Sequence, residues 1–376
     1  MINGIAYMPV SVTFGKNNPE WRYNMFWYKN NPYYFYPNVF VSPFVTGTET
    51  IRNQISGSDQ EADFPDAKFI VADSGGFQIT SHRPGISFSA LDILNWQENK
   101  IQADVAFTLD VPVYSYRTEV KGQRYYTDGH FEKCLAQSLK NNDIMLSAKK
   151  RKETELWAVL QGGNYKDLDV WYKAVTREHE FKGYCFPTGS SFAPKQKEDM
   201  FGQIQFAKDV GTNFHFLGRC EPILVLILAK LSQITGKLYT YDTASAATAL
   251  MLGKYHEPRF LSSLSFSNIP ERRVHFPPDS HPPCPCPICQ KHTCEEMWNN
   301  AYLIFLHNVW VRVDLNDYIY RMARDDDVFN ELVNKYLALH SVYRKNSKEI
   351  KDKINSVLYG EKRRYSLLKD FVKNDI

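Results

Sequence analysis

Short apolar runs that end in Asp, Gly or Ser alternate with segments of helical periodicity, and this alternation constrains the fold more than any other feature of the sequence. Apolar strands that alternate with helices are typical of a parallel sheet covered by helices. The apolar runs span 69–72, 105–109, 156–160, 183–186, 214–217 and 238–241, and helical periodicity spans 89–102, 130–148, 166–178, 195–210, 221–235 and 244–253. The pattern predicts an α/β fold of the (β/α)8 TIM-barrel type.

A barrel of this type needs two more strands. The first is predicted at 6–10, and the second is expected from either 36–47 or 259–266, a choice that the sequence leaves open. Eight prolines between residues 256 and 290 predict a loop, because proline interrupts both helices and sheets. Helices are predicted to resume over 295–314 and 317–376.

Composition excludes several classes of protein. The 376 residues suffice for one barrel with an appendage, and no apolar stretch reaches the roughly 18 residues that a membrane span needs. The first residues lack a basic segment followed by an apolar one, so we expect a cytoplasmic protein without membrane association. The net charge of +3 does not identify a partner. Basic residues gather at 149–152 and 344–376. Each run is either the solvated face of a helix or a contact for phosphate groups, and the sequence does not decide between the two.

Acidic and amide side chains follow several of the predicted strands. Asp73, Asp110 and Asp242 each come directly after an apolar run, and Gln161 with Gly162 follows another. A single Asp in this position is more often the cap of the next helix. The carboxyl ends of the strands form the active-site face of a (β/α)8 barrel, so three Asp and one Gln at these positions predict a site.

The loop after the first of these aspartates suits a flat ligand. Ser74, Gly75, Gly76 and Phe77 follow Asp73, and the glycines allow a close approach of backbone while the phenyl ring offers a stacking surface. Two glycines by themselves indicate only a turn. No glycine-rich phosphate loop follows any predicted strand, so the sequence gives no support for ATP-driven or nicotinamide-dependent chemistry.

The sequence resembles the tRNA-guanine transglycosylase superfamily from about residue 5 to 310. The segments that carry the resemblance are Asp73-Ser74-Gly75-Gly76-Phe77-Gln78, Leu109-Asp110-Val111-Pro112, Leu160-Gln161-Gly162-Gly163, Phe216-Leu217-Gly218, Tyr241-Asp242-Thr243-Ala244-Ser245 and Cys284-Pro285-Cys286-Pro287-Ile288-Cys289. The first and last segments are specific together in this order. The short segments between them would be weak alone.

The resemblance implies a base-exchange reaction. Asp242 would be the nucleophile that forms a covalent glycosyl-enzyme intermediate, and Asp73 the general acid and base. Asp110 would accept hydrogen bonds from guanine, and Phe77 would stack on it. The remaining substrate-binding residues that the resemblance implies are Ser74, Gly75, Gly76, Gln161, Gly162, Gly189, Ser190, Leu217 and Gly218.

Three of the seven cysteines lie within six residues, which in an intracellular chain indicates a metal site. Cys284, Cys286 and Cys289 suit tetrahedral Zn²⁺, and the resemblance implies His307 as the fourth ligand of a structural site. His292 and Cys294 are the nearer competitors for that position. We therefore expect a catalytic barrel over 1–283, a zinc-binding subdomain packed on it over 284–310, and a C-terminal helical extension over 311–376.

The resemblance also bears on the nucleic acid. The segment after Asp242 is closer to the archaeal tRNA enzymes, but the sequence shows no counterpart of their C-terminal RNA-binding domains. A compact core of this kind is most similar to the DpdA group, which inserts 7-deazaguanine bases into DNA. We expect DNA and a free 7-deazaguanine base as partners, with tRNA as the alternative substrate. A non-catalytic nucleic-acid-binding subunit is the rival function, and a homodimer or a helper protein stays open.

Overall fold

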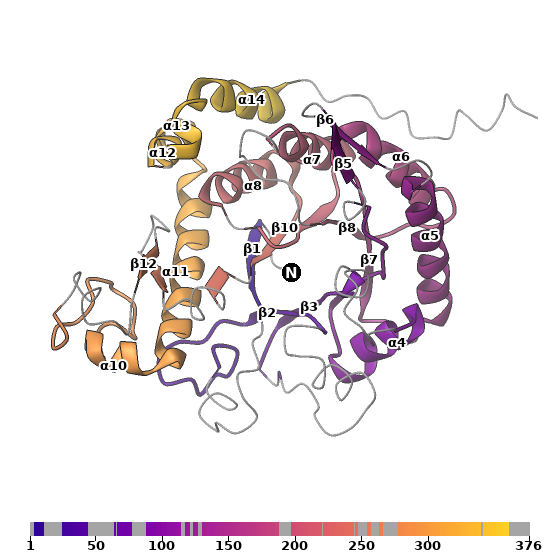
Figure 1. The fold of residues 1–376 in the computed structure, drawn as a ribbon. Helices are drawn as coiled ribbons and strands as arrows, with labels where there is room; N and C mark the ends of the chain where they lie inside the picture. Colours follow the sequence, from indigo (N-terminus) through magenta and orange to yellow (C-terminus); the bar gives the residue numbers. More distant parts are fainter. Residues whose placement is uncertain are drawn as a thin grey trace, which may run out of the picture.

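Eight parallel strands form a barrel in the computed structural model (Figure 1). Neighbouring strands pair in the order β1-β10-β9-β8-β7-β4-β3-β2, and a parallel bridge between Val10 and Phe40 joins the two end strands. The strands are β1 (Ile5–Pro9), β2 (Asn38–Val41), β3 (Phe69–Ala72), β4 (Val105–Phe107), β7 (Glu155–Val159), β8 (Gly183–Phe186), β9 (Asn213–Phe216) and β10 (Tyr239–Thr243). The predicted (β/α)8 architecture is confirmed.

The structure describes residues 4–10, 25–43, 64, 66–76, 88–113, 117–120, 123–126, 130–187, 197–219, 221–243, 245–246, 254–256, 263–265, 277–339 and 341–360. Helices surround the barrel, as Figure 1 shows in the view along its axis. They are α4 (Ala90–Asn95), α5 (His130–Ala148), α6 (Tyr165–Thr176), α7 (Lys197–Val210) and α8 (Pro222–Thr235). The predicted helix over 244–253 lies largely outside the described residues. None of the described helices combines the length and apolar character needed to cross a membrane.

Alternating side chains of the strands fill the interior of the barrel. Met8, Phe107 and Trp157 belong to a buried cluster that is separate from the larger apolar layer between the strands and the helices. Because side chains alternate along a strand, the inward positions of β7 continue from Trp157 through Val159 to Gln161. The same alternation in β10 places Thr240 and Asp242 on one face. Polar groups therefore follow the apolar filling at the carboxyl end of the barrel.

The open choice for the remaining strand is settled by β2. Its four residues pair in parallel with β3, so the segment 36–47 supplies the barrel strand. The alternative segment, 259–266, was wrong for this role because β12 (Ser263–Ser265) pairs with β11 (Lys254–His256) in a separate antiparallel hairpin. That hairpin also corrects the prediction that 256–290 is loop throughout.

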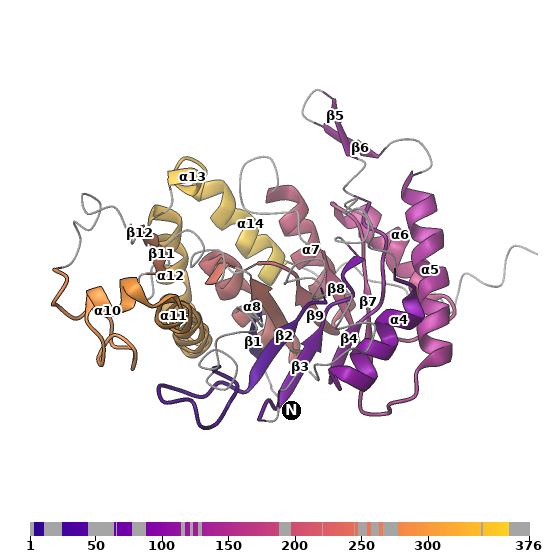
Figure 2. The same ribbon diagram turned by 60° about the horizontal axis from the view of Figure 1, so that its bottom comes forward.

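The predicted helix over 89–102 is divided. It begins as α4, capped by Ser89, and continues as the π-helix η1 (Trp96–Lys100). The next predicted strand, 105–109, is shorter than expected and ends at Phe107. After it a second antiparallel hairpin, β5 (Arg117–Val120) and β6 (Gln123–Tyr126), projects from the carboxyl end of the barrel (Figure 2).

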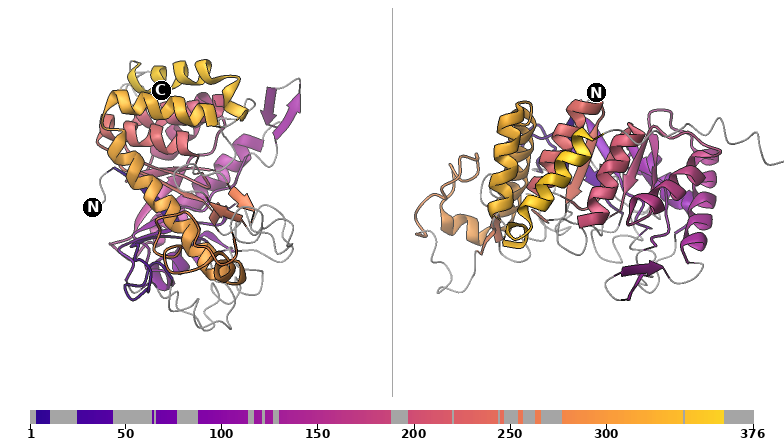
Figure 3. Two further views of the ribbon diagram at one scale, coloured as in Figure 1. Left: turned by 90° about the vertical axis from the view of Figure 1, so that its left-hand side faces the viewer. Right: turned by 90° about the horizontal axis from the view of Figure 1, so that it is seen from above.

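The described C-terminal residues form several helices, in agreement with the helical segments predicted over 295–314 and 317–376. They are α10 (Cys294–Asn299), α11 (Ala301–Met322), α12 (Asp326–Leu339), α13 (Ser341–Arg344) and α14 (Ser347–Tyr359), which lie along one side of the barrel (Figure 3). Two buried lysines of the barrel helices hold them. Lys208 donates to the carbonyl oxygens of Val357 at 2.8 Å and Gly360 at 2.6 Å, and Lys230 donates to that of Ala323 at 3.1 Å.

Candidate functional site

Asp73 follows β3 and is held by three neighbouring groups. Ser42 Oγ donates to its Oδ2 at 3.0 Å, and the backbone N–H of Ser74 donates to Oδ1 at 2.8 Å. Burial raises the pKa of Asp73, and repulsion from Asp242 raises it further, while the hydrogen bonds from Ser42, Gly75 and Ser74 oppose the shift. The carboxyl group therefore holds a proton more readily than an ordinary Asp.

Asp110 follows β4 and lies against the same loop, with 7% of its surface exposed. Ser74 Oγ donates to its Oδ1 at 3.4 Å, and Gln161 Nε2 donates to its Oδ2. Burial raises the pKa of Asp110 to about 7, and repulsion from Asp73 adds to this effect. Gln161 is buried, and its Oε1 has no hydrogen-bond partner in the described part of the chain. This pair can accept and donate hydrogen bonds to a polar flat ligand.

Gly76 is the point at which the loop meets Asp110. A Cβ atom at Gly76 would lie 2.6 Å from both the carbonyl oxygen and Oδ1 of Asp110, closer than real Cβ atoms come. Gly75 adopts a φ of 69°, in the left-handed region that favours glycine. The two glycines thus bring the loop backbone against the carboxylate, which is a structural reason for the pair.

Asp242 is the last acidic side chain of the group and lies near the end of β10. Its Oδ1 accepts a hydrogen bond from the N–H of Gly218 at 2.6 Å and contacts His215 Nε2 at 3.1 Å. The described residues donate no hydrogen bond to Oδ2. One oxygen of this carboxylate is therefore fixed in place while the other is available to a ligand.

His215 was not predicted as a site residue. It is fully buried in β9, where Nδ1 contacts Thr240 Oγ1 at 2.8 Å and the ring stacks on Phe40 with centroids 5.4 Å apart. The alternation along β9, which turns every second side chain inward, was the signal that could have found it. A buried imidazole between a hydroxyl and a carboxylate fixes the orientation of Asp242.

Gln97 of the π-helix was also missed. Its Nε2 reaches the carbonyl oxygens of Phe107 at 2.9 Å, Asp73 at 3.1 Å and Ala72 at 3.4 Å. These carbonyls belong to the ends of β3 and β4, from which Asp73 and Asp110 project. π-Helical turns inside α-helices are frequent at functional sites. This one holds together two of the three acidic strand ends.

The other predicted substrate-binding residues divide into two groups. Gly162 directly follows Gln161, and Leu217 packs on the barrel-interior cluster beside Gly218. Phe77, Gly189 and Ser190 lie outside the described residues. The structure therefore brings together Asp73, Ser74, Gly75, Gly76, Asp110, Gln161, Gly162, Leu217, Gly218 and Asp242 at the carboxyl ends of the strands.

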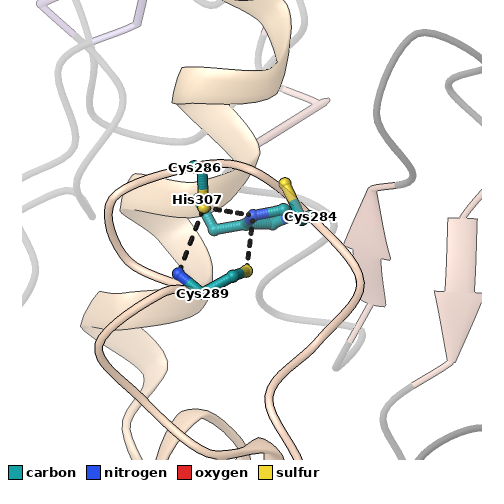
Figure 4. A group of neighbouring side chains, drawn as sticks. All are labelled: Cys284, Cys286, Cys289 and His307. Atoms are coloured by element: carbon teal, nitrogen blue, oxygen red, sulfur yellow. Dashed lines mark hydrogen bonds between the residues drawn. The ribbon is translucent and has the colours of Figure 1, made fainter.

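The predicted metal ligands meet away from this site. Cys284, Cys286 and Cys289 come from the loop before α10, and His307 projects from α11 toward them (Figure 4). All four are buried, and their ligand atoms lie within 4.8 Å of one another. His307 Nδ1 is 3.2 Å from Cys286 Sγ, and its Nε2 contacts the carbonyl oxygen of His256 at 2.8 Å. A proton on Nε2 leaves Nδ1 as a ligand, the arrangement found at metal-binding histidines.

The three thiols strongly affect one another's ionisation. Hydrogen bonds from the neighbouring thiols lower the pKa of Cys284, whereas the interaction with Cys284 raises that of Cys286 and Cys289. A divalent metal ion would let all three ionise, because a bound thiol is deprotonated by the metal. The donor set, three sulfurs and one imidazole nitrogen, fits a closed tetrahedral site. These residues could hold a metal ion.

The competing ligands have other partners. His292 contacts the Tyr33 hydroxyl at 2.7 Å and Glu296 at 3.2 Å, and Cys294 lies 3.8 Å from the Ser280 hydroxyl. Neither belongs to the cluster of four.

Helix α11, which carries His307, also contacts the segment before β2. Tyr34 donates to the carbonyl oxygen of Leu306 at 2.9 Å, and Asn31 donates to the Tyr302 hydroxyl at 3.4 Å. Tyr36 of the same segment donates to the carbonyl oxygen of Tyr7 in β1 at 2.8 Å. The segment 31–36 thus connects α11 to β1 and leads into β2, the two strands at the bridge that closes the barrel.

Comparisons with known proteins show which enzymes the chain is similar to. The chain is 23% identical over 263 residues to the tRNA-guanine(15) transglycosylase of Thermococcus onnurineus, which covers 66% of this chain and 39% of the relative. The enzyme of the same name from Pyrococcus abyssi is 22% identical over 288 residues, covering 73% and 44%. That from Methanosarcina mazei is 22% identical over 250 residues, covering 64% and 45%. The chain therefore spans less than half the length of these relatives.

A family match covers most of the chain. The family described as Queuine tRNA-ribosyltransferase (TGT) matches residues 44–342, a range that includes all three acidic strand ends and the four clustered metal-ligand candidates. On this match, the chain belongs to the tRNA-guanine transglycosylase family.

Proposed function

We propose that this chain is a pentosyltransferase that exchanges a guanine base in a nucleic acid for a free 7-deazaguanine-type base. The observation that carries the proposal is a pair of carboxyl groups whose charges interact and whose surroundings differ. Asp242 has one oxygen fixed by Gly218 and His215 and the other available, whereas burial and the charge of Asp242 raise the pKa of Asp73. Two carboxyl groups in different environments are what a double displacement at a sugar carbon requires.

In the proposed reaction, Oδ2 of Asp242 attacks the anomeric carbon of the nucleoside. The bond from that carbon to the guanine nitrogen breaks, its electron pair leaves with the base, and Asp73 supplies the proton that neutralises the base. The incoming base then gives a proton to Asp73 and attacks the same carbon, and the bond to Asp242 breaks. One glycosidic bond replaces another, so the cycle needs no external energy source.

Asp110 and Gln161 would select guanine. An ionised carboxylate can accept hydrogen bonds from both the ring N–H and the amino group of guanine, which adenine does not offer in the same arrangement. The buried Oε1 of Gln161 has no partner among the described residues and can take a further donor. In this proposal the cluster of Cys284, Cys286, Cys289 and His307 holds Zn²⁺ that supports the fold and takes no part in the reaction.

DNA is the substrate that we predict from the sequence, and tRNA is the second candidate. The names of the relatives, which are tRNA-guanine(15) transglycosylases, favour tRNA. The two substrates differ physically, because a base in duplex DNA must be extruded at a cost of about a few kcal/mol, whereas an RNA loop presents unstacked bases. The same catalytic residues would act on a guanine in DNA or in tRNA.

The test is the release of labelled guanine from duplex DNA and from tRNA when a free 7-deazaguanine base is added. Release from only one of them identifies the substrate. The variant Asp242→Asn should abolish both release and covalent trapping of the nucleic acid, while Asp279→Asn, which changes an exposed carboxylate, should retain them. Release by Asp242→Asn at the rate of the unaltered protein would refute the mechanism. No release from either substrate would favour a non-catalytic subunit.

A further inference from the structure

Arg219 is a buried cation beside the proposed nucleophile. It follows Gly218, whose N–H binds Asp242, and it comes shortly before α8. Only 5% of its surface is exposed. Its Nε and Nη2 atoms are buried and have no hydrogen-bond partner in the part of the chain that the structure describes.

The two unpaired nitrogen atoms indicate which ligand would satisfy the hydrogen bonds of Arg219. A guanidinium removed from water is unfavourable unless its N–H groups are satisfied. Nε–H and Nη2–H lie along one edge of the guanidinium, and such an edge binds two oxygens of one carboxylate or phosphate through parallel hydrogen bonds. The free edge of Arg219 therefore fits an anion with two neighbouring oxygens.

Carboxylates of the protein interact with the charge of Arg219 but leave this edge without a hydrogen bond from the described residues. Burial lowers the pKa of Arg219, and the charges of Glu221, Asp199 and Asp242 oppose that shift. Glu221 is the largest of these influences, yet its Oε2 is also buried without a hydrogen-bond partner among the described residues. The guanidinium thus lies close enough to Asp242 for their charges to interact.

We propose that Arg219 binds a phosphodiester group next to the guanosine whose base is exchanged, through its Nε and Nη2 edge. This inference rests on the proposed function, since a nucleotide must come within bonding distance of Asp242. That nucleotide carries a phosphodiester on each side of its sugar, and each would be repelled by the Asp242 carboxylate. A cation between the two anions offsets the repulsion and fixes the register of the strand.

The experiment compares the unaltered protein with Arg219→Gln on short substrates of the active kind. Each substrate carries one uncharged methylphosphonate linkage, placed in turn at successive positions around the target guanine. For the unaltered protein, we expect one linkage near the guanine at which loss of charge raises the KM for nucleic acid about ten- to a hundredfold. Arg219→Gln should show that higher KM on the fully charged substrate and no further increase at this linkage. Its KM for the free base should be unchanged.

Arg219→Lys and Glu221→Gln are the matched controls. Lysine keeps the charge but not the two-donor edge, so Arg219→Lys should recover only part of the lost affinity. If Arg219 served only to neutralise Glu221, then Glu221→Gln would raise the KM for nucleic acid as much as Arg219→Gln does, and the inference would be wrong.

Two further results would overturn the proposal. One is an unaltered protein that is insensitive to every methylphosphonate, which needs no variant to be observed. The other is an Arg219→Gln protein with the same linkage sensitivity as the unaltered one. In both cases guanine release continues, so the proposed function would stand. Absence of release from every fully charged substrate would instead mean that the proposed function itself had failed.

Discussion

The raised pKa of Asp110 predicts that removing its charge makes the protein more stable, by an amount that depends on pH. The pKa is 3.8 for an ordinary Asp and about 7 for Asp110, where burial is the main cause. Each pKa unit corresponds to about 1.4 kcal/mol, so ionised Asp110 costs the folded state up to about 4 kcal/mol. Asp110→Asn removes this cost and keeps the shape of the side chain.

The sign follows from the titration of the two states. At pH 8 Asp110 is ionised in both folded and unfolded chains, and the folded state bears nearly the full cost. At pH 5 it is protonated in the folded chain but ionised in most of the unfolded chain, and the cost falls to about 1.5 kcal/mol. Stability is thus lost as pH rises toward the folded-state pKa. Asp110→Asn should stabilise the protein by about 2 to 3 kcal/mol more at pH 8 than at pH 5.

The surroundings of Asp110 can accept this change. Ser74 Oγ can still donate to the asparagine oxygen. Gln161 now donates through Nε2, and it can turn its amide to present Oε1, which has no partner among the described residues. Base exchange should nevertheless be lost, because asparagine cannot accept two hydrogen bonds from guanine at one edge as a carboxylate does.

The assay is urea unfolding followed by tryptophan fluorescence at pH 5 and pH 8, for the unaltered protein, Asp110→Asn and Asp279→Asn. The last variant neutralises an exposed carboxylate and is the control for the loss of one negative charge. The reasoning would be refuted if the free energies of unfolding of Asp110→Asn and the unaltered protein differed by the same amount at both pH values. Asp110 would then titrate as an ordinary surface carboxyl group.

Three other changes test the remaining parts of the site. His307→Ala should abolish binding of one zinc per chain and cost more than about 3 kcal/mol of stability, measured by metal analysis and urea unfolding, whereas His292→Ala should keep the metal. His215→Phe keeps the ring stack but loses both polar contacts, so it should lower kcat about ten- to a hundredfold. His215→Gln should recover part of this rate, because its amide can still donate to the nucleophile. Equal kcat values for the two variants would contradict a positioning role. Gly76→Ala should cost about 1 to 3 kcal/mol in urea unfolding and raise the KM for nucleic acid, because its Cβ would collide with Asp110; unchanged values would show that the loop yields freely.

The strands were the most predictable part of the fold because their apolar runs report burial directly. β3 and β8 have the predicted limits, and most others differ by a residue or two. The limits of β2 were harder to predict, since the segment 36–47 contains Pro37 and Pro43 and alternates poorly. The π-helix was unpredictable for another reason: η1 spans only five residues, too few to establish an apolar period that differs from that of the α-helix before it.

The acidic residues of the site were predictable because each ends a strand, and parallel strands bring their ends together. The residues that support them were not. Gln97 lies in a helix and His215 within a strand, and each is recognised only when its partner on another element is known. Arg219 is similar, since the sequence does not reveal that a guanidinium is buried with one edge unsatisfied.

The contacts of the segment 31–36 connect the helix of the candidate metal site to the seam at which the barrel closes. A closed barrel has no free edge, and here the last join is made by the parallel bridge of Val10 and Phe40. Tyr36 and Tyr34 connect that seam to Tyr7 and to the helix that carries His307. If the cluster of Cys284, Cys286, Cys289 and His307 holds a metal ion, its loss would loosen the helix that supports this seam. An opened seam would expose strand edges able to pair with other chains, so we expect metal removal to promote aggregation as well as unfolding.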